Sequence, residues 1–194
     1  MRAARQLWHE SLKDVPAERL VFLDESGAQT NMTRTHGRAA RGVRVVDRVP
    51  HGHWHTTTMI SAIRTTGPFA AAVVSGATDS DVFRTYVEHV LVPELIAGDV
   101  VILDNLRPHK AAGVKQMIES AGARLAYLPP YSPDFNPIEN MWSKVKRHLR
   151  SAAARTFDTL QQAVTDALGH VTASDCVGFF RHCGYHAMRK GAPL

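Results

Sequence analysis

The feature that most constrains this chain is a proline-rich stretch: three of the five residues from 129 to 133 are prolines, which excludes regular secondary structure there. Asn136 and Pro137 follow, and they predict a helix start because Asn suits the residue before a helix and Pro suits its first turn. Glu139 stands in that first turn. One interpretation is structural, with Glu139 completing a capping box with Asn136. The other is functional, with a stiff loop delivering one carboxylate to a fixed point.

The composition is that of a globular protein. The 194 residues are 44% hydrophobic and 21% charged, which suits a single domain with a full core. The net charge of +5 favours a polyanionic partner. The sequence shows no signal peptide and no apolar run long enough for a membrane span. Cys176 and Cys183, the only cysteines, would lie roughly 10 Å apart on one helix, too far to bridge, which predicts a reduced, cytoplasmic protein.

Hydrophobic patterning predicts an α/β fold. Short apolar runs indicate five strands and periodic apolar residues indicate helices between and after them. The strands are expected at 20–23, 56–63, 69–74, 99–104 and 125–128, with helices at about 82–96, 110–121, from 137 onward, 157–168 and 174–188. The second and third strands form a hairpin. The expected organisation is a linker or helix at 1–18, a core at 19–155 and packed C-terminal helices at 156–194.

Acidic residues follow two of these strands. Asp24 and Asp104 each come directly after a continuous apolar run, which predicts two central, adjacent, parallel strands. The carboxyl ends of such strands meet at one edge of a sheet, although a turn acid at a strand end is also common. The proline-rich loop would bring Glu139 to the same edge. Three converging carboxylates should raise one another's pKa values and bind hard divalent cations, which predicts two Mg²⁺ ions, with Mn²⁺ able to substitute.

Basic residues accompany the acids. A polar segment from 29 to 49 and the helix after Glu139 supply candidate contacts to DNA phosphates: Arg34, Arg38, Arg41, Lys144, Lys146, Arg147 and Arg150. On a helix, Lys146 and Arg150 fall within roughly 20° of Glu139, so they could hold a phosphate backbone across the site. A merely solvated basic loop and helix face is the alternative.

Two histidine clusters could suggest further metal sites. His51, His53 and His55 alternate, but no Cys or Asp completes them, so a turn before the next strand is the favoured interpretation. His182, Cys183 and His186 have helical spacing that suits zinc, yet packing of Cys183 in the core is the simpler explanation.

Two motifs resemble a known family. Leu103–His109 is similar to the second-aspartate motif, and Tyr127–Trp142 to the third-acid signature, of DDE transposases from the bacterial insertion-sequence branch of the mariner superfamily. The 34 residues between Asp104 and Glu139 match the spacing of that branch. The resemblance extends to the segments 51–58 and 179–185, and so covers nearly the whole chain.

The resemblance implies a ribonuclease-H-like fold and Mg²⁺-dependent cleavage and joining of double-stranded DNA at transposon ends. By the same resemblance, Asp24, Asp104 and Glu139 bind the catalytic metals, while Asn105 and His109 support the site or contact DNA. A homodimer on DNA, associated with the bacterial nucleoid, is expected.

One departure from the family concerns the N-terminus. The first catalytic strand begins near residue 20, so the helix-turn-helix modules that recognise terminal repeats are expected to be missing, or to belong to a separately encoded N-terminal partner. Two other functions remain open: another ribonuclease-H-like nuclease, and an inactive DNA-binding remnant of an insertion element. The third-acid signature favours the transposase.

Overall fold

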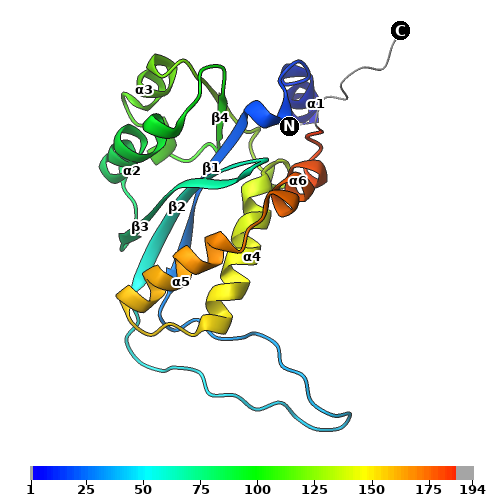
Figure 1. Ribbon diagram of the computed structural model, residues 1–194, viewed down its shortest axis with the longest axis vertical. Helices are drawn as coiled ribbons and strands as arrows, with labels where there is room; N and C mark the ends of the chain where they lie inside the picture. Colours follow the sequence, from blue (N-terminus) through cyan, green and yellow to red (C-terminus); the bar gives the residue numbers. More distant parts are fainter. Residues whose placement is uncertain (1, 187–194) are drawn as a thin grey trace.

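A mixed five-stranded sheet forms the centre of the molecule, as the sequence predicts (Figure 1). The computed structural model describes residues 2–186. In space the strands follow the order β3-β2-β1-β4-β5, with β1 antiparallel to β2 and parallel to β4. The strand bounds are β1 Leu20–Gln29, β2 Thr56–Arg64, β3 Gly67–Ser75, β4 Val100–Leu103 and β5 Arg124–Tyr127.

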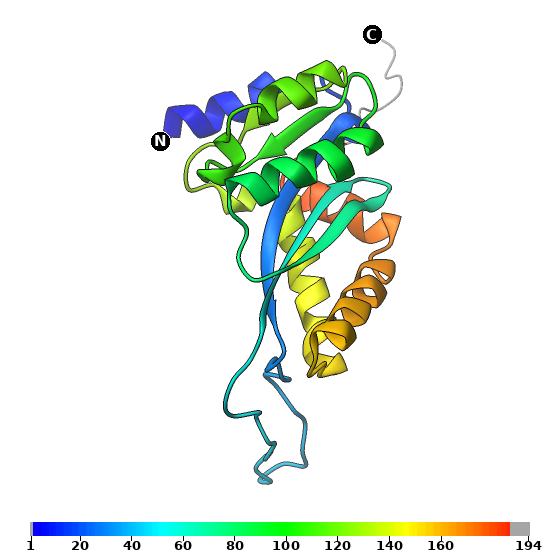
Figure 2. The same ribbon diagram turned by 90° about the vertical axis from the view of Figure 1, so that its left-hand side faces the viewer.

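Helices cover both faces of this sheet, and Figure 2 shows the two layers. The helix bounds are α1 Arg2–Ser11, α2 Ser80–Tyr86, α3 Val114–Ser120, α4 Pro137–Ala152, α5 Phe157–Gly169 and α6 Ala173–His182. Alternate residues of β1 serve two separate cores: Leu20 and Phe22 pack with α1, α4, α5 and α6, whereas Val21 and Leu23 pack with α2 and α3. The apolar run at 20–23 is therefore buried on both faces, as predicted.

The first strand is longer than predicted. β1 continues to Gln29 because its antiparallel partner β2 pairs with it as far as Thr56, well beyond the end of the parallel partner β4. Asp24 consequently lies inside the strand, opposite Ser61, and the prediction that it follows the strand end is wrong.

Two helix predictions were also too long. The helix expected from 110 begins only at Val114, because a 3₁₀ turn occupies Pro108–Lys110 and Gly113 has a φ of 89°. The helix expected to reach 96 is α-helical only to Tyr86; a π turn and a 3₁₀ turn complete it, and Pro93 supplies no N–H to continue the α-helical ladder. A third helix prediction was too long as well: α6 ends at His182, and residues 183–186 are not helical, while the predicted end at residue 188 lies outside the described residues.

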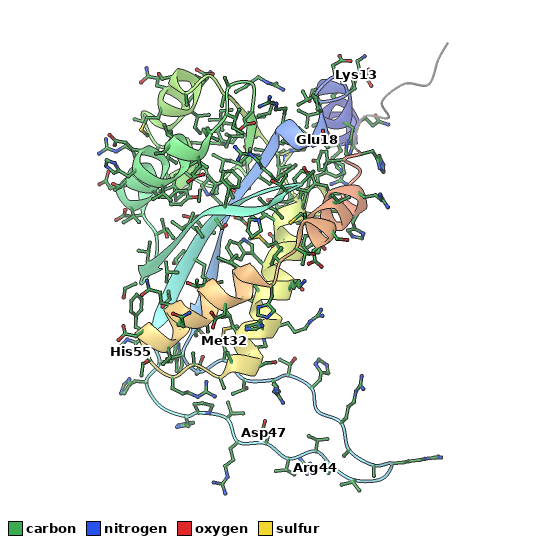
Figure 3. All side chains as sticks on the ribbon, in the orientation of Figure 1. Lys13, Glu18, Met32, Arg44, Asp47 and His55 are labelled. Carbon is green, nitrogen blue, oxygen red and sulfur yellow. The ribbon has the colours of Figure 1, made fainter. Side chains whose placement is uncertain are left out.

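A long arm joins β1 to β2. Residues 31–55 contain no helix or strand and extend past the end of the sheet (Figures 1 and 3). Of the two predictions for the polar segment 29–49, a loop or an irregular hairpin, the loop is therefore confirmed from residue 31 onward. The arm starts and finishes beside the lower ends of α4 and α5, where Arg155 Nη1 donates to the carbonyl oxygens of Thr30 and Met32. Within the described residues, no helix is long and apolar enough to cross a bilayer.

The N-terminal segment, for which helix and linker were both open, forms α1 and joins the main core. Trp8 is only 7% exposed, and its Nε1 donates to the hydroxyl of Tyr185 at 2.7 Å. That hydroxyl donates in turn to the backbone oxygen of Phe135 at 2.8 Å. A chain of two hydrogen bonds, the first buried and the second partly buried, thus links α1, the segment after α6 and the proline-rich loop.

We expect Trp8→Phe to lower the free energy of unfolding by about 1–2 kcal/mol, because it removes the indole N–H while keeping an aromatic ring in place. Urea unfolding measures this difference. Leu7→Ala on the same helix is the matched control, since Leu7 is 65% exposed and its loss should change stability by less than about 0.5 kcal/mol. Equal stability of wild type and Trp8→Phe would contradict a stabilising role for this hydrogen bond.

Candidate active site

The register of the two central strands brings Asp24 and Asp104 together. β1 and β4 pair in parallel from Leu20 opposite Val100 to Phe22 opposite Ile102. Continuing that register by two residues places Asp24 beside Asp104, the residue that follows β4. Asp24 is 8% exposed, whereas the Asp104 side chain is 36% exposed. The two carboxylates therefore occupy one level of the sheet but differ in their access to solvent.

The proline-rich loop brings Glu139 to the same place. The loop begins where Leu128 N–H donates to the carbonyl of Leu103 at 2.8 Å, and Asn105 Nδ2 donates to the carbonyl of Leu128 at 2.5 Å. Both bonds tie the start of the loop to the segment that carries Asp104. A cavity of about 450 Å³ lies against this loop, and both Asp104 and Glu139 line it.

The capping interpretation of Glu139 is wrong. Asn136 precedes α4, but its side chain makes no capping hydrogen bond, and its Oδ1 is buried without a partner among the described residues. The N–H of Glu139 bonds instead to the backbone oxygen of Asn136 at 3.2 Å. The Glu139 side chain is exposed and lines the cavity, so its carboxylate is available for another role.

A residue that sequence reasoning missed holds the far end of the loop. Arg5 of α1 donates from Nη1 to the hydroxyl of Ser132 at 2.8 Å, and from both Nη atoms to the carboxylate of Asp134 at 2.9 and 2.5 Å. Its guanidinium also lies over the ring of Phe135, 4.2 Å from the centroid. The hydrogen bonds from Arg5 hold the pKa of Asp134 below its usual range. The loop is therefore fixed on both sides of its prolines.

His109 links Asp104 to a third carboxylate. The imidazole is fully buried; its Nδ1 lies 2.5 Å from Asp104 Oδ1 and its Nε2 lies 3.2 Å from Glu25 Oε2. A ring nitrogen that faces an ionised carboxylate must donate to it, so contacts from both nitrogens to carboxylates favour the protonated imidazole. Burial alone would lower the pKa of His109, but the hydrogen bonds to Asp104 and Glu25 outweigh it and raise the pKa to about 9.

The pKa values of the two aspartates are shifted in opposite directions. Burial raises the pKa of Asp24 to about 7, and the charges of Glu139 and Asp104 add to this rise against a backbone hydrogen bond at Glu25. For Asp104, burial also acts to raise the pKa, but hydrogen bonds from His109 and the Leu106 N–H outweigh it, so the pKa falls. The expected mutual rise in pKa is thus confirmed for Asp24, where burial is the largest cause, and is wrong for Asp104.

The donor set suits a hard divalent cation, although the described residues contain no group of three His, Cys, Asp or Glu side chains gathered closely enough to hold a metal. Asp104 directs Oδ1 toward His109 and the Leu106 N–H, which leaves Oδ2 for another ligand. Asp24 carries a buried carboxyl group that a nearby cation would help to ionise. The chemistry of the three acids therefore fits Mg²⁺ or Mn²⁺.

The two histidine clusters were also candidates for metal binding. His51, His53 and His55 lie exposed in the arm and form no metal-binding group in the part of the chain that the structure describes. Cys183 is buried, as its core interpretation predicts, while His182 and His186 are exposed.

The predicted basic contacts separate into three groups. Arg34, Arg147 and Arg150 line one hollow of about 430 Å³ between the arm and α4. Arg38 and Arg41 are exposed farther along the arm, and Lys146 is half-buried on α4. Lys144 forms a 2.5 Å ion pair with Asp175 of α6, which fastens α6 to α4 and argues against its predicted role in binding DNA.

Comparison with known sequences identifies a family. The family described as DDE superfamily endonuclease matches residues 19–161. A transposase of the transposable element Tcb2 from Caenorhabditis briggsae is 39% identical over 62 residues, which are 30% of this chain and 23% of the relative. This relative is a nematode protein, so the match bears on the family and not on a bacterial branch.

Solved structures share the fold. The Mos1 transposase paired-end complex with the left transposon end gives a TM-score of 0.73 at 13% identity, covering 94% of this chain and 56% of that one. The catalytic domain of Mos1 mariner transposase gives a TM-score of 0.64 at 12% identity, covering 94% of this chain and 84% of that domain. The expected ribonuclease-H-like architecture is confirmed, and the chain spans about half the length of the Mos1 chain in the paired-end complex.

The raised pKa of Asp24 predicts a pH-dependent effect of Asp24→Asn in metal-free protein. Below about pH 4 the carboxyl group is protonated in both the folded and the unfolded chain. Between about pH 4 and pH 7 the unfolded chain releases this proton first, so the stability of the wild type falls as pH rises. Asn carries no charge, and the variant's advantage should therefore grow across this window, on the order of 1.4 kcal/mol per pKa unit.

Urea unfolding in EDTA at pH 5 and pH 8 measures this change. Asp47→Asn is the matched control because Asp47 is exposed in the arm. An advantage of Asp24→Asn that is equal at the two pH values would contradict the burial of an ionisable Asp24.

Proposed function

This chain belongs to the DDE superfamily endonucleases, and from that premise we propose that it is a transposase catalytic domain that cleaves and joins DNA at transposon ends. The observation that carries the proposal is that Asp24 of β1 lies beside Asp104, which directly follows the parallel strand β4, while Asp104 and Glu139 line one cavity. The bacterial insertion-sequence branch of the mariner superfamily is the finer proposal, supported by the third-acid signature at Tyr127–Trp142.

In this proposal Asp24, Asp104 and Glu139 hold two divalent ions, Mg²⁺ or Mn²⁺. When bound, such a pair supplies the charge that activates a water molecule and stabilises the leaving oxygen in phosphoryl transfer. The residues themselves do three things: Asp24 offers a carboxyl group whose raised pKa a nearby cation would lower, Asp104 is oriented by His109, and Glu139 is positioned at the start of α4. Asn105 supports the same arrangement through its bond to the Leu128 carbonyl.

The proposed substrate is double-stranded DNA, since relatives of the same fold are described as Mos1 transposase complexes with a transposon end. The hollow lined by Arg34, Arg147 and Arg150 supports this, because guanidinium groups bind phosphates through paired hydrogen bonds. Arg150 follows Glu139 along α4 by roughly 16 Å, about the length of five base pairs, so DNA bound in the hollow could reach the acids. We propose that two copies of the chain act together on DNA, as a homodimer.

Two other functions are compatible with the fold. Another ribonuclease-H-like nuclease would use the same acids, and an inactive remnant would bind DNA without cutting it. The proline-rich signature favours the transposase over the first, and the intact set of three acids favours it over the second.

We expect the purified chain to nick supercoiled plasmid DNA in the presence of Mg²⁺ or Mn²⁺, and Asp104→Asn to abolish nicking, because an amide binds a divalent cation far less well than a carboxylate. Agarose gel electrophoresis of the relaxed product measures both. Asp47→Asn is the matched control and should nick at the wild-type rate, since Asp47 is exposed in the arm. If the wild-type chain binds DNA but does not nick it, the result would favour the inactive remnant.

We also expect Arg147→Ala/Arg150→Ala to weaken DNA binding and to reduce the slope of log K against log salt by about 0.9 for each phosphate that the protein no longer neutralises. Fluorescence anisotropy with a labelled duplex over a range of NaCl concentrations measures the slope. Arg84→Ala/Lys115→Ala is the matched control, because it removes the same charge from α2 and α3 on the other face of the sheet. Equal slopes for the two double variants would exclude the hollow as a phosphate site.

A further inference from the structure

Glu25 is a partly buried acid for which neither the motifs nor the proposed mechanism provides a role. It is next to Asp24 on β1, and neighbouring residues of a strand point to opposite faces of the sheet. Asp24 therefore faces the side of the sheet that α4 covers, and Glu25 faces the side of α2 and α3. Its side chain is only 14% exposed, and its Oε2 lies 3.2 Å from Nε2 of His109.

Three other contacts hold His109. The ring of Phe83 packs against the imidazole with 4.6 Å between centroids, and the hydroxyl of Tyr127 donates to the His109 backbone oxygen at 3.0 Å. Nδ1 bonds to Asp104 Oδ1 at 2.5 Å. Glu25 is thus the partner that fixes the remaining ring nitrogen, and with it the rotation of the imidazole.

The orientation of His109 decides which oxygen of Asp104 is free. Oδ1 accepts from both His109 Nδ1 and the Leu106 N–H, the latter at 2.9 Å. Among the described residues, Oδ2 takes part in no hydrogen bond, and Asp104 lines the cavity that Glu139 also lines. A rotation of the imidazole would leave Oδ1 with the Leu106 N–H as its one partner among the described residues, so the carboxylate would be held less firmly and could turn.

We propose that Glu25 is a positioning residue that acts through His109 to fix Oδ1 of Asp104 and so reserve Oδ2 for a divalent cation. This inference rests on the proposed function, because it concerns the same acids. Removal of a residue that orients a metal ligand through hydrogen bonds commonly changes metal affinity by about 10–100-fold. Glu25 and His109 together form such a support for Asp104. Glu25 would therefore influence metal binding without touching the metal.

A purely structural role explains Glu25 less well. Its Oε1 is buried with no hydrogen-bond partner among the described residues, which costs free energy that a smaller or apolar side chain would not. The pairing of β1 with β2 involves only the backbone of Glu25, opposite Ile60. The one strong interaction of this side chain is the bond to His109, so its removal should affect Asp104 more than it affects the fold.

The test compares three variants of the full chain. Glu25→Ala removes the contact to His109, whereas Glu25→Gln removes the charge but keeps an oxygen that accepts from Nε2–H. Gln29→Ala is the control, since Gln29 is on the same strand and face and is partly buried. Mn²⁺ affinity is measured by electron paramagnetic resonance, and the ring nitrogens of His109 are observed by ¹⁵N NMR of metal-free protein, with His109→Gln to assign the signals. Urea unfolding verifies that each variant is folded.

We expect Glu25→Ala to weaken Mn²⁺ binding by about 10–100-fold and to shift the Nε2 signal of His109, while Glu25→Gln recovers most of the affinity and Gln29→Ala matches the wild type. An equal loss in Glu25→Ala and Glu25→Gln would show that Glu25 acts by charge and would overturn the proposal, as would wild-type affinity in Glu25→Ala. A wild type that binds no Mn²⁺ and does not nick DNA would instead refute the proposed function. The two failures are therefore distinguishable.

Discussion

The parallel pairing of β1 with β4 is the interaction on which the rest of the site depends. It places Asp24 and Asp104 side by side at the centre of the sheet, where β1 is covered on both faces. Two acids in such a position would destabilise the sheet if both were charged and unassisted. The surrounding residues reduce this cost in a different way for each acid, by shifting the pKa of Asp24 upward and the pKa of Asp104 downward.

Asp24 and Asp104 favour different protonation states. Burial favours the protonated form of Asp24 and raises its pKa to about 7, while the protonated imidazole of His109 keeps Asp104 ionised. Two neighbouring acids with pKa values pushed apart can coexist without full mutual repulsion. The metal-free site thus holds less negative charge than three ionised carboxylates would, and a divalent cation would restore the missing ionisation at Asp24.

The sequence was sufficient for the sheet, because the strands follow from local apolar runs such as 20–23 and 99–104. The proposed set of three acids also came from local patterns, namely the two strand ends and the proline-rich loop before Glu139. It could not reveal Glu25 or Arg5. Their contacts join residues 84 and 129 positions apart, and no local pattern records which side chains a fold brings together. The sequence also could not show that the capping box of Asn136 and Glu139 is absent, since Asn136 does precede the helix but its buried side chain makes no capping hydrogen bond.

The loop that leads to Glu139 contacts residues outside the family match, which covers 19–161. Arg5 binds Ser132 and Asp134 from the N-terminal side, and Tyr185 binds the backbone of Phe135 from the C-terminal side. Trp8 joins these two supports by its bond to Tyr185. The three acids belong to the matched core, but the position of the third depends on α1 and on the segment after α6. The geometry of the site is therefore a property of the whole described chain and not of the matched core alone.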